Sequence, residues 1–191
     1  MRFFVVCATL ILASGCSPSG DTPTPLVLTD TSLGPLSLRP ESIISIHRLE
    51  QIFPAHRVTH AIRSGDSPDY HYFEVAADDG EVLFTISSFL QQGQQLKDPN
   101  SVRIDLLKVI SPRIADGHGL RVGDRVADIV RARGTNLQFG AAHFDVYLGA
   151  DSIFYNIRTS GQSSPDRLTF DDAARENWAI ISISWPGPAW E

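Results

Sequence analysis

The chain has 191 residues, with 16 Lys and Arg against 22 Asp and Glu and a formal net charge of −6. Because an acidic surface repels phosphate groups, we expect no binding to nucleic acid or to anionic lipid headgroups. The two cysteines are Cys7 and Cys16. A product that starts at an acylated Cys16 has no thiol left for a disulfide, a cysteine nucleophile or a thiolate metal site.

The first sixteen residues have the layout of a bacterial lipoprotein signal. Arg2 gives a positive start, residues 3–12 form an apolar run too short to span a bilayer, and small residues lead to Cys16. We expect cleavage between Gly15 and Cys16 and attachment of a diacylglycerol, with fatty acids such as palmitate, to the Cys16 thiol. The alternative is an ordinary secretory signal followed by a chance cysteine.

The domain organisation follows from this leader. We expect a signal peptide over residues 1–15, a flexible tether over 16–31 and one domain over 32–191, because residues 17–24 show no apolar periodicity. Ser17 lacks the acidic character that commonly retains lipoproteins at the inner membrane. We therefore expect a periplasm-facing protein on the outer membrane, with the periplasmic face of the inner membrane as the alternative.

The first half of the domain predicts one helix and three strands. These elements span residues 43–53, 70–76, 81–87 and 101–111. Apolar residues recur at helical spacing between Pro40 and Pro54, and two alternating segments flank the turn 78–80, which is typical of a β-hairpin. On the third strand we expect one face to carry Val102, Ile104, Leu106 and Ile110.

The second half predicts the same order of elements. They span residues 124–134, 143–148, 152–159 and 178–185, with a short acidic helix over 171–177. Asp124 is the expected cap of the first helix and Gly134 its end, while residues 149–151 form the hairpin turn. Trp178 begins the last strand.

Apolar blocks of the first half recur in the second. Phe73-Glu74-Val75, for example, returns as Phe144-Asp145-Val146, which predicts a duplicated unit with repeat one over about residues 34–112 and repeat two over about 119–186. We predict an α+β fold: one antiparallel sheet of two tandem helix-plus-three-strand repeats, both helices on one face and the other face partly free. Chance similarity between amphipathic segments is the alternative.

The loop between the two predicted repeats displays four polar side chains. They are Arg113, Asp116, His118 and Arg121. Two arginines beside a helix N-terminus could bind an anionic group. We favour a structural connector, because helix starts without a ligand are far commoner than anion sites.

Histidines and catalytic motifs give little support to an enzyme. His56 and His60 would lie about 13 Å apart on one face of a strand, too far for a common metal ion. We therefore expect no metal and no cofactor. No nucleophile elbow, zinc-binding helix or phosphate-binding loop is present in the sequence, so we expect no enzymatic activity. A hydrolase with carboxylates from distant strands is kept as an alternative.

Aromatic residues on predicted strands and at the C-terminus are candidates for a binding surface. They are Tyr70, Tyr72, Phe154, Trp178, Trp185 and Trp190. We expect at least half of them to be in the core, because strands buried by helices use aromatic residues routinely.

Several segments resemble the sigma-E-regulated lipoprotein family of Gram-negative bacteria. They are Tyr72-Phe73-Glu74-Val75, the runs 111–116 (Ser-Pro-Arg-Ile-Ala-Asp) and 119–124 (Gly-Leu-Arg-Val-Gly-Asp), and Trp178 with Ile183-Ser184-Trp185. The resemblance spans about residues 36–185 and implies an envelope lipoprotein of unassigned activity, linked to envelope stress, without catalytic residues to transfer.

These observations lead to one functional hypothesis and two alternatives. The hypothesis is a membrane-anchored, non-catalytic binding or scaffolding module that recognises an envelope protein or a peptidoglycan-linked component through the free face of its sheet. The first alternative is a periplasm-facing carrier of a small apolar ligand or lipid, and the second is an unrecognised hydrolase.

Overall fold

The computed structural model describes residues 25–40, 42–64, 69–89, 102–142, 145–157 and 168–187. The predicted cleavage position at Gly15 and Cys16, most of the predicted tether and Trp190 lie outside the described residues. Within these ranges no helix is both long enough and apolar enough to cross a membrane.

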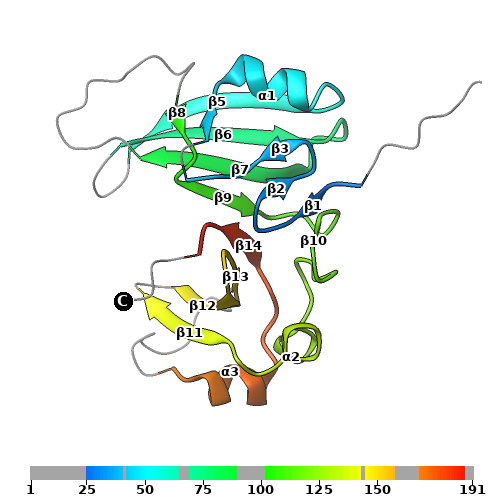
Figure 1. The fold of residues 1–191 in the computed structure, drawn as a ribbon, viewed down its shortest axis with the longest axis vertical. Coiled ribbons are helices and arrows are strands. Elements are labelled where there is room, and N and C mark those ends of the chain that lie inside the picture. Colours follow the sequence, from blue (N-terminus) through cyan, green and yellow to red (C-terminus); the bar gives the residue numbers. More distant parts are fainter. Residues whose placement is uncertain are drawn as a thin grey trace, which may run out of the picture.

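One eight-stranded antiparallel sheet dominates the molecule, in the order β11-β12-β13-β14-β9-β7-β6-β5 (Figure 1). Its first half contains β5 (Arg57–Arg63), β6 (Tyr70–Ala76), β7 (Val82–Phe89) and β9 (Leu106–Val109). Its second half contains β11 (Gln138–Ala142), β12 (Asp145–Ala150), β13 (Ile153–Asn156) and β14 (Ser182–Trp185). The halves are joined by β9 and β14, where Val109 lies opposite Ile183.

Two smaller sheets are built from strands of two residues. The first contains β1 (Val27–Leu28), β2 (Ser32–Leu33), β3 (Leu36–Ser37) and β10 (Ala115–Asp116) in the order β10-β1-β2-β3. In the second, β4 (Ile43–Ile44) pairs with β8 (Val102–Arg103). The first small sheet thus ties the N-terminal described segment to the loop that follows β9.

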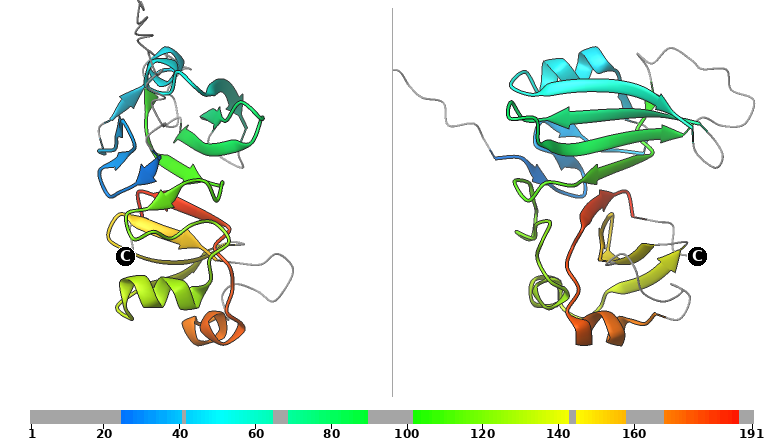
Figure 2. Two further views of the ribbon diagram at one scale, coloured as in Figure 1. Left: turned by 90° about the vertical axis from the view of Figure 1, so that its right-hand side faces the viewer. Right: turned by 180° about the vertical axis from the view of Figure 1, so that it is seen from behind.

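The described residues contain three short helices: α1 (Ile46–Ile52), α2 (Val126–Arg133) and α3 (Phe170–Glu176). Ser45 caps α1 by accepting from the Arg48 N–H at 3.0 Å, and Thr169 forms a capping box with Asp172 at the start of α3. Figures 1 and 2 show α1 beside β5 at one end of the molecule, and α2 with α3 at the opposite end.

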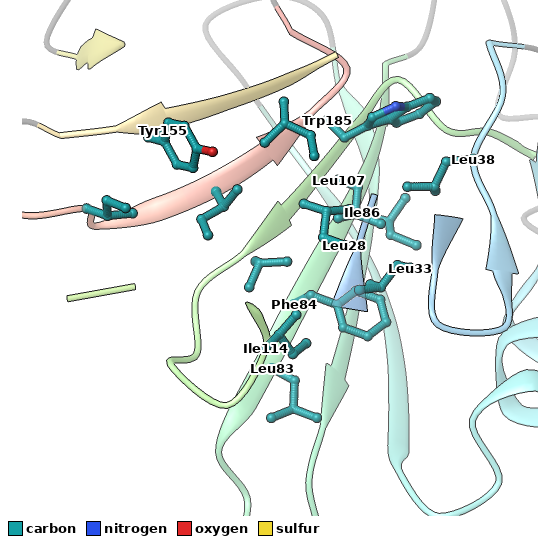
Figure 3. Close-up of a cluster of buried hydrophobic side chains, with 14 of the residues drawn as sticks. Leu28, Leu33, Leu38, Leu83, Phe84, Ile86, Leu107, Ile114, Tyr155 and Trp185 are labelled. Atoms are coloured by element: carbon teal, nitrogen blue, oxygen red, sulfur yellow. The ribbon is translucent and has the colours of Figure 1, made fainter. Parts of the chain in front are cut away.

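The core lies on one face of the large sheet, which we call the inner face. One row of paired residues crosses all eight strands on this face: Val58, Val75, Phe84, Val109, Ile183, Tyr155, Leu148 and Phe139. Leucines of the first small sheet, including Leu28 and Leu33, cover the middle of the row near Phe84 (Figure 3). The Trp185 indole N–H donates to the Asp30 carbonyl at 2.9 Å. This hydrogen bond connects the first small sheet to strand β14 of the large sheet.

The predicted α+β fold of two helix-plus-three-strand repeats is wrong. The protein is mainly β, and each half of the large sheet contains four strands, because β5 and β11 extend it at its two edges. The helices have only seven or eight residues, and the small sheet, instead of the helices, covers the middle of the inner face. Ile43 fitted helical spacing but forms strand β4 with Ile44, since a short apolar run suits either structure.

The single predicted strand over residues 101–111 is also wrong. The chain breaks at Ile104 and Asp105, between β8 and β9, and the Asp105 N–H donates to the Ser87 carbonyl at 3.1 Å. This interruption changes which residues point inwards. Leu107 and Val109 are buried, whereas Ile110 is 37% exposed.

Candidate functional site

Five side chains form a patch on the opposite, outer face of β5, β6 and β7. Strand alternation places Arg63, Tyr70, Tyr72, Glu74 and Phe89 on this face. Arg63 lies directly opposite Tyr70, and Tyr70 lies opposite Phe89 on the next strand. We call these five residues the outer-face patch.

The side chains of the outer-face patch hold one another in place. The Arg63 Cζ lies 3.6 Å from the centroid of the Tyr72 ring, and its Nη2 donates to Glu74 Oε1 at 3.1 Å. The Tyr70 ring lies edge-on to Tyr72, with centroids 6.2 Å apart, and 5.6 Å from the Phe89 ring. Such mutual contacts reduce the side-chain entropy that a binding event would otherwise cost.

The outer-face patch is half open to solvent. The Phe89 side chain is 44% exposed, and both tyrosines are half-buried. The pKa of the Tyr72 phenol is raised, mainly by burial. The hydroxyl therefore stays neutral at physiological pH and can donate a hydrogen bond. The Phe89 N–H donates to Asp105 Oδ2 at 2.8 Å, which fixes the end of β7 beneath the exposed ring.

This composition suits recognition better than catalysis. Tyrosine, phenylalanine and arginine are enriched at the centres of protein interfaces, where rigid aromatic side chains bury large areas at small entropic cost. The charges of Arg63 and Glu74 neutralise each other, so the patch presents aromatic rings together with a paired guanidinium that covers one face of Tyr72.

The structure divides the aromatic residues proposed from sequence. Tyr70 and Tyr72 lie in the outer-face patch, whereas the other described candidates are buried: Phe154, Trp178 and Trp185. The sequence reasoning missed Arg63 and Phe89. Residues 57–63 carry few apolar side chains and so gave a weak strand signal, and Arg63 meets the tyrosines only through the pairing of β5 with β6.

In the connecting loop, the two arginines have partners within the chain. Arg113 forms ion pairs with Asp79 and with Glu81, the latter at 2.9 Å from its Nε. The Arg121 Nη1 donates to the carbonyls of Pro112 and Arg113 at 2.9 and 3.0 Å. His118 is exposed. The Arg113 ion pairs join the loop to the turn between β6 and β7, and the Arg121 contacts lie within the loop. The favoured connector and the anion-binding alternative both stay predictions.

Asp116, the fourth loop residue, is buried in a hydrogen-bond network. Its carboxylate accepts from the Tyr155 hydroxyl at 2.5 Å and from the backbone N–H groups of His118 and Leu120 at 2.8 and 2.9 Å. The Tyr155 hydroxyl also accepts from Arg133 Nη1 at 3.0 Å. Burial, followed by the nearby carboxylate, raises the pKa of Tyr155. The network therefore fastens the loop to the second half of the sheet and to the end of α2.

Two histidines on the neighbouring strands β5 and β6 come together on the inner face. The His60 Nε2 lies 3.0 Å from the His71 Nδ1. From the sequence, His60 was instead considered together with His56 as a pair of metal ligands. No cluster of three or more His, Cys, Asp or Glu side chains that could hold a metal ion occurs in the described part of the chain.

These features place the chain among mainly antiparallel β-sheet domains with a preorganised aromatic surface. No family model matches the chain, and no curated protein sequence matches it. The crystal structure of the uncharacterized protein YfeY from Escherichia coli is similar over 84% of this chain and 99% of that chain, with a TM-score of 0.59 and 17% sequence identity. A likeness at this identity shows a shared fold.

Proposed function

We propose that the protein is a lipid-anchored envelope lipoprotein that acts as a non-catalytic binding module, linked to envelope stress. The outer-face patch carries the binding part of this proposal, because its aromatic rings are partly exposed and already held in position. The leader sequence and the resemblance to sigma-E-regulated lipoproteins support the anchor and the compartment. The carrier and hydrolase alternatives have no specific observation in their favour among the described residues.

The anchor predicts a defined mature N-terminus. Intact-mass spectrometry of protein isolated from host membranes is expected to find Cys16 as the first residue, carrying a diacylglycerol. Cys16→Ser should abolish acylation and release the protein from membranes, whereas Cys7→Ser, within the apolar run that is removed, should leave processing unchanged. An intact leader or an unmodified Cys16 thiol would contradict the anchor.

The partner that we favour is an envelope protein. Aromatic rings with a neutralised arginine–glutamate pair offer apolar contact area and few unsatisfied charges, which suits a protein surface with apolar anchors. A glycan strand of peptidoglycan is the competing occupant. It is distinguished by muramidase digestion, which would release a glycan partner and leave a protein partner attached.

Variants of the outer-face patch test this function. Phe89→Ala and Tyr72→Ala are each expected to reduce the yield of partner crosslinked in intact cells by about tenfold, since aromatic anchors at an interface centre contribute more than 1 kcal/mol. Ile181→Ala is the matched control, because Ile181 is 45% exposed and Phe89 44% exposed. Unchanged crosslinking in both patch variants would refute this binding surface.

A further inference from the structure

The strands that carry the outer-face patch hold a histidine pair on their other face. His60 lies opposite Phe73 and His71 lies opposite Ile62, so both imidazoles point to the inner side of β5 and β6. β5 is the last strand of the large sheet, and within that sheet it pairs only with β6. The contact between the two imidazoles therefore adds to the attachment of an edge strand that contributes Arg63 to the outer-face patch.

The geometry of the pair requires a neutral acceptor. His60 Nε2 and His71 Nδ1 are 3.0 Å apart, and the ring centroids are 5.3 Å apart at 27°. One nitrogen donates its hydrogen and the other accepts it. If both rings were protonated, two N–H groups would face each other and two positive charges would be adjacent. The hydrogen bond can therefore exist only while at least one ring is neutral.

Burial makes protonation of His71 unfavourable. His71 is 1% exposed, and its buried Nε2 has no hydrogen-bond partner among the described residues. Desolvation lowers the pKa of both histidines, and the charge of His71 lowers the pKa of His60 further. Protonation of the pair in the folded state is therefore unfavourable, most of all at the buried His71 ring.

Among the described residues, the charged groups on the strands beside the pair lie on the other face of the sheet. Arg57 and Arg63 on β5 and Glu74 on β6 lie on the outer face by strand alternation. On β7, the cross-strand neighbour of His71 is the uncharged Ser88. The α1 helix, which packs beside β5, carries the exposed residues His47, Arg48 and Glu50, and His47 contacts Glu50 and Gln51.

We propose that the His60–His71 pair is a proton-operated latch that holds β5 against β6 at neutral pH and releases it in mildly acidic surroundings. Release loosens Arg63 from Tyr72 and so weakens the outer-face patch. This regulatory role rests on the proposed binding function of the patch. An exported protein is exposed to external pH, which makes such a response useful.

The sign of the pH effect follows from linkage. An unfolded histidine has a pKa of about 6.5, and both folded values are lower. Below neutral pH the open state therefore binds more protons than the closed state. The stability that the pair contributes is fully present above the unfolded pKa and is lost as the pH falls towards the folded pKa values. The equilibrium constant for opening of β5 rises by up to about tenfold per pH unit for each histidine.

Hydrogen exchange in the full-length protein tests the latch without a partner. After correction for the intrinsic pH dependence of exchange, the β5 amides of the wild type are expected to lose about tenfold or more of their protection between pH 7.5 and 5.5. His60→Gln, which keeps a side chain that can hydrogen bond but cannot titrate, should reduce this loss by the contribution of His60, and the double variant His60→Gln/His71→Gln should remove most of it. His118→Gln, on the exposed loop, should behave as the wild type.

Several outcomes would overturn the latch. The first is equal hydrogen-exchange protection of the β5 amides at pH 7.5 and 5.5. The second is a loss of protection in His60→Gln that is as large as in the wild type. The third is an NMR signal of the His71 ring that titrates near pH 6.5. The proposed function is tested separately by partner crosslinking at pH 7.5. If the patch variants have no effect there, the binding function fails, whereas hydrogen exchange still decides whether the latch exists.

Discussion

Replacing Asp116 by alanine is expected to lower the free energy of unfolding by about 3–4 kcal/mol. The carboxylate is 2% exposed and accepts hydrogen bonds from the Tyr155 hydroxyl and from two backbone N–H groups. Alanine leaves all three donors without their partner, and each buried, unsatisfied group costs about 1–3 kcal/mol. Equilibrium denaturation followed by tryptophan fluorescence measures the loss.

Controls separate this network from a general effect of removing an aspartate. Asp78→Ala, in the exposed turn between β6 and β7, should change stability by less than about 0.5 kcal/mol. Tyr155→Phe removes one donor, so the double variant with Asp116→Ala should be less destabilised than the sum of the two single variants. A loss below about 1 kcal/mol for Asp116→Ala, or strict additivity, would show that the network does not hold the loop.

The sequence predicted those elements whose apolar pattern is complete. Strand β6 occupies the predicted residues, Tyr70–Ala76, because its side chains alternate between core and surface. The helix predicted over residues 124–134 is confirmed as α2 (Val126–Arg133), ending at Gly134, although Arg125 instead of Asp124 is the N-cap. Asp124 accepts from the Arg121 N–H instead. Local signals therefore located the element but not the residue that caps it.

Elements at the margins of the sheet escaped prediction for a physical reason. Most side chains of β5 are exposed, so the apolar alternation of this edge strand is weak, and a strand here was considered only in weighing His56 with His60. The strands β1, β2 and β3 have two residues each, which is shorter than any periodicity. Without these strands, the predicted helices seemed to be the only available cover for the sheet, and the fold class was wrong as a result.

The candidate site could be predicted only in part. Tyr70 and Tyr72 were proposed because they lie on a clear strand, but their contacts with Arg63 and Phe89 depend on which strands pair and in what register. The same holds for the His60–His71 pair, whose members meet only because β5 and β6 pair in this register. Pairing is a long-range property, and spacing along one segment does not specify it.

Phe84→Ala is expected to destabilise the protein by about 3–5 kcal/mol. Phe84 is fully buried at 0% exposure, and its ring makes an edge contact with Phe53 at a centroid distance of 5.2 Å. It supports Leu28 and Leu33 of the small sheet (Figure 3), so truncation opens a cavity between the two sheets. Urea titration should show a lower midpoint with an unchanged m-value.

Phe89 on the same strand provides the matched control, because its side chain lies on the opposite face and is 44% exposed. Phe89→Ala should cost less than about 1 kcal/mol of stability, yet it is one of the two variants expected to lose partner crosslinking. Two phenylalanines of β7 therefore separate folding from recognition. Equal destabilisation by Phe84→Ala and Phe89→Ala would mean that the outer face is packed as tightly as the inner face. The exposed rings would then stabilise the fold and would not form a surface that is free to bind a partner.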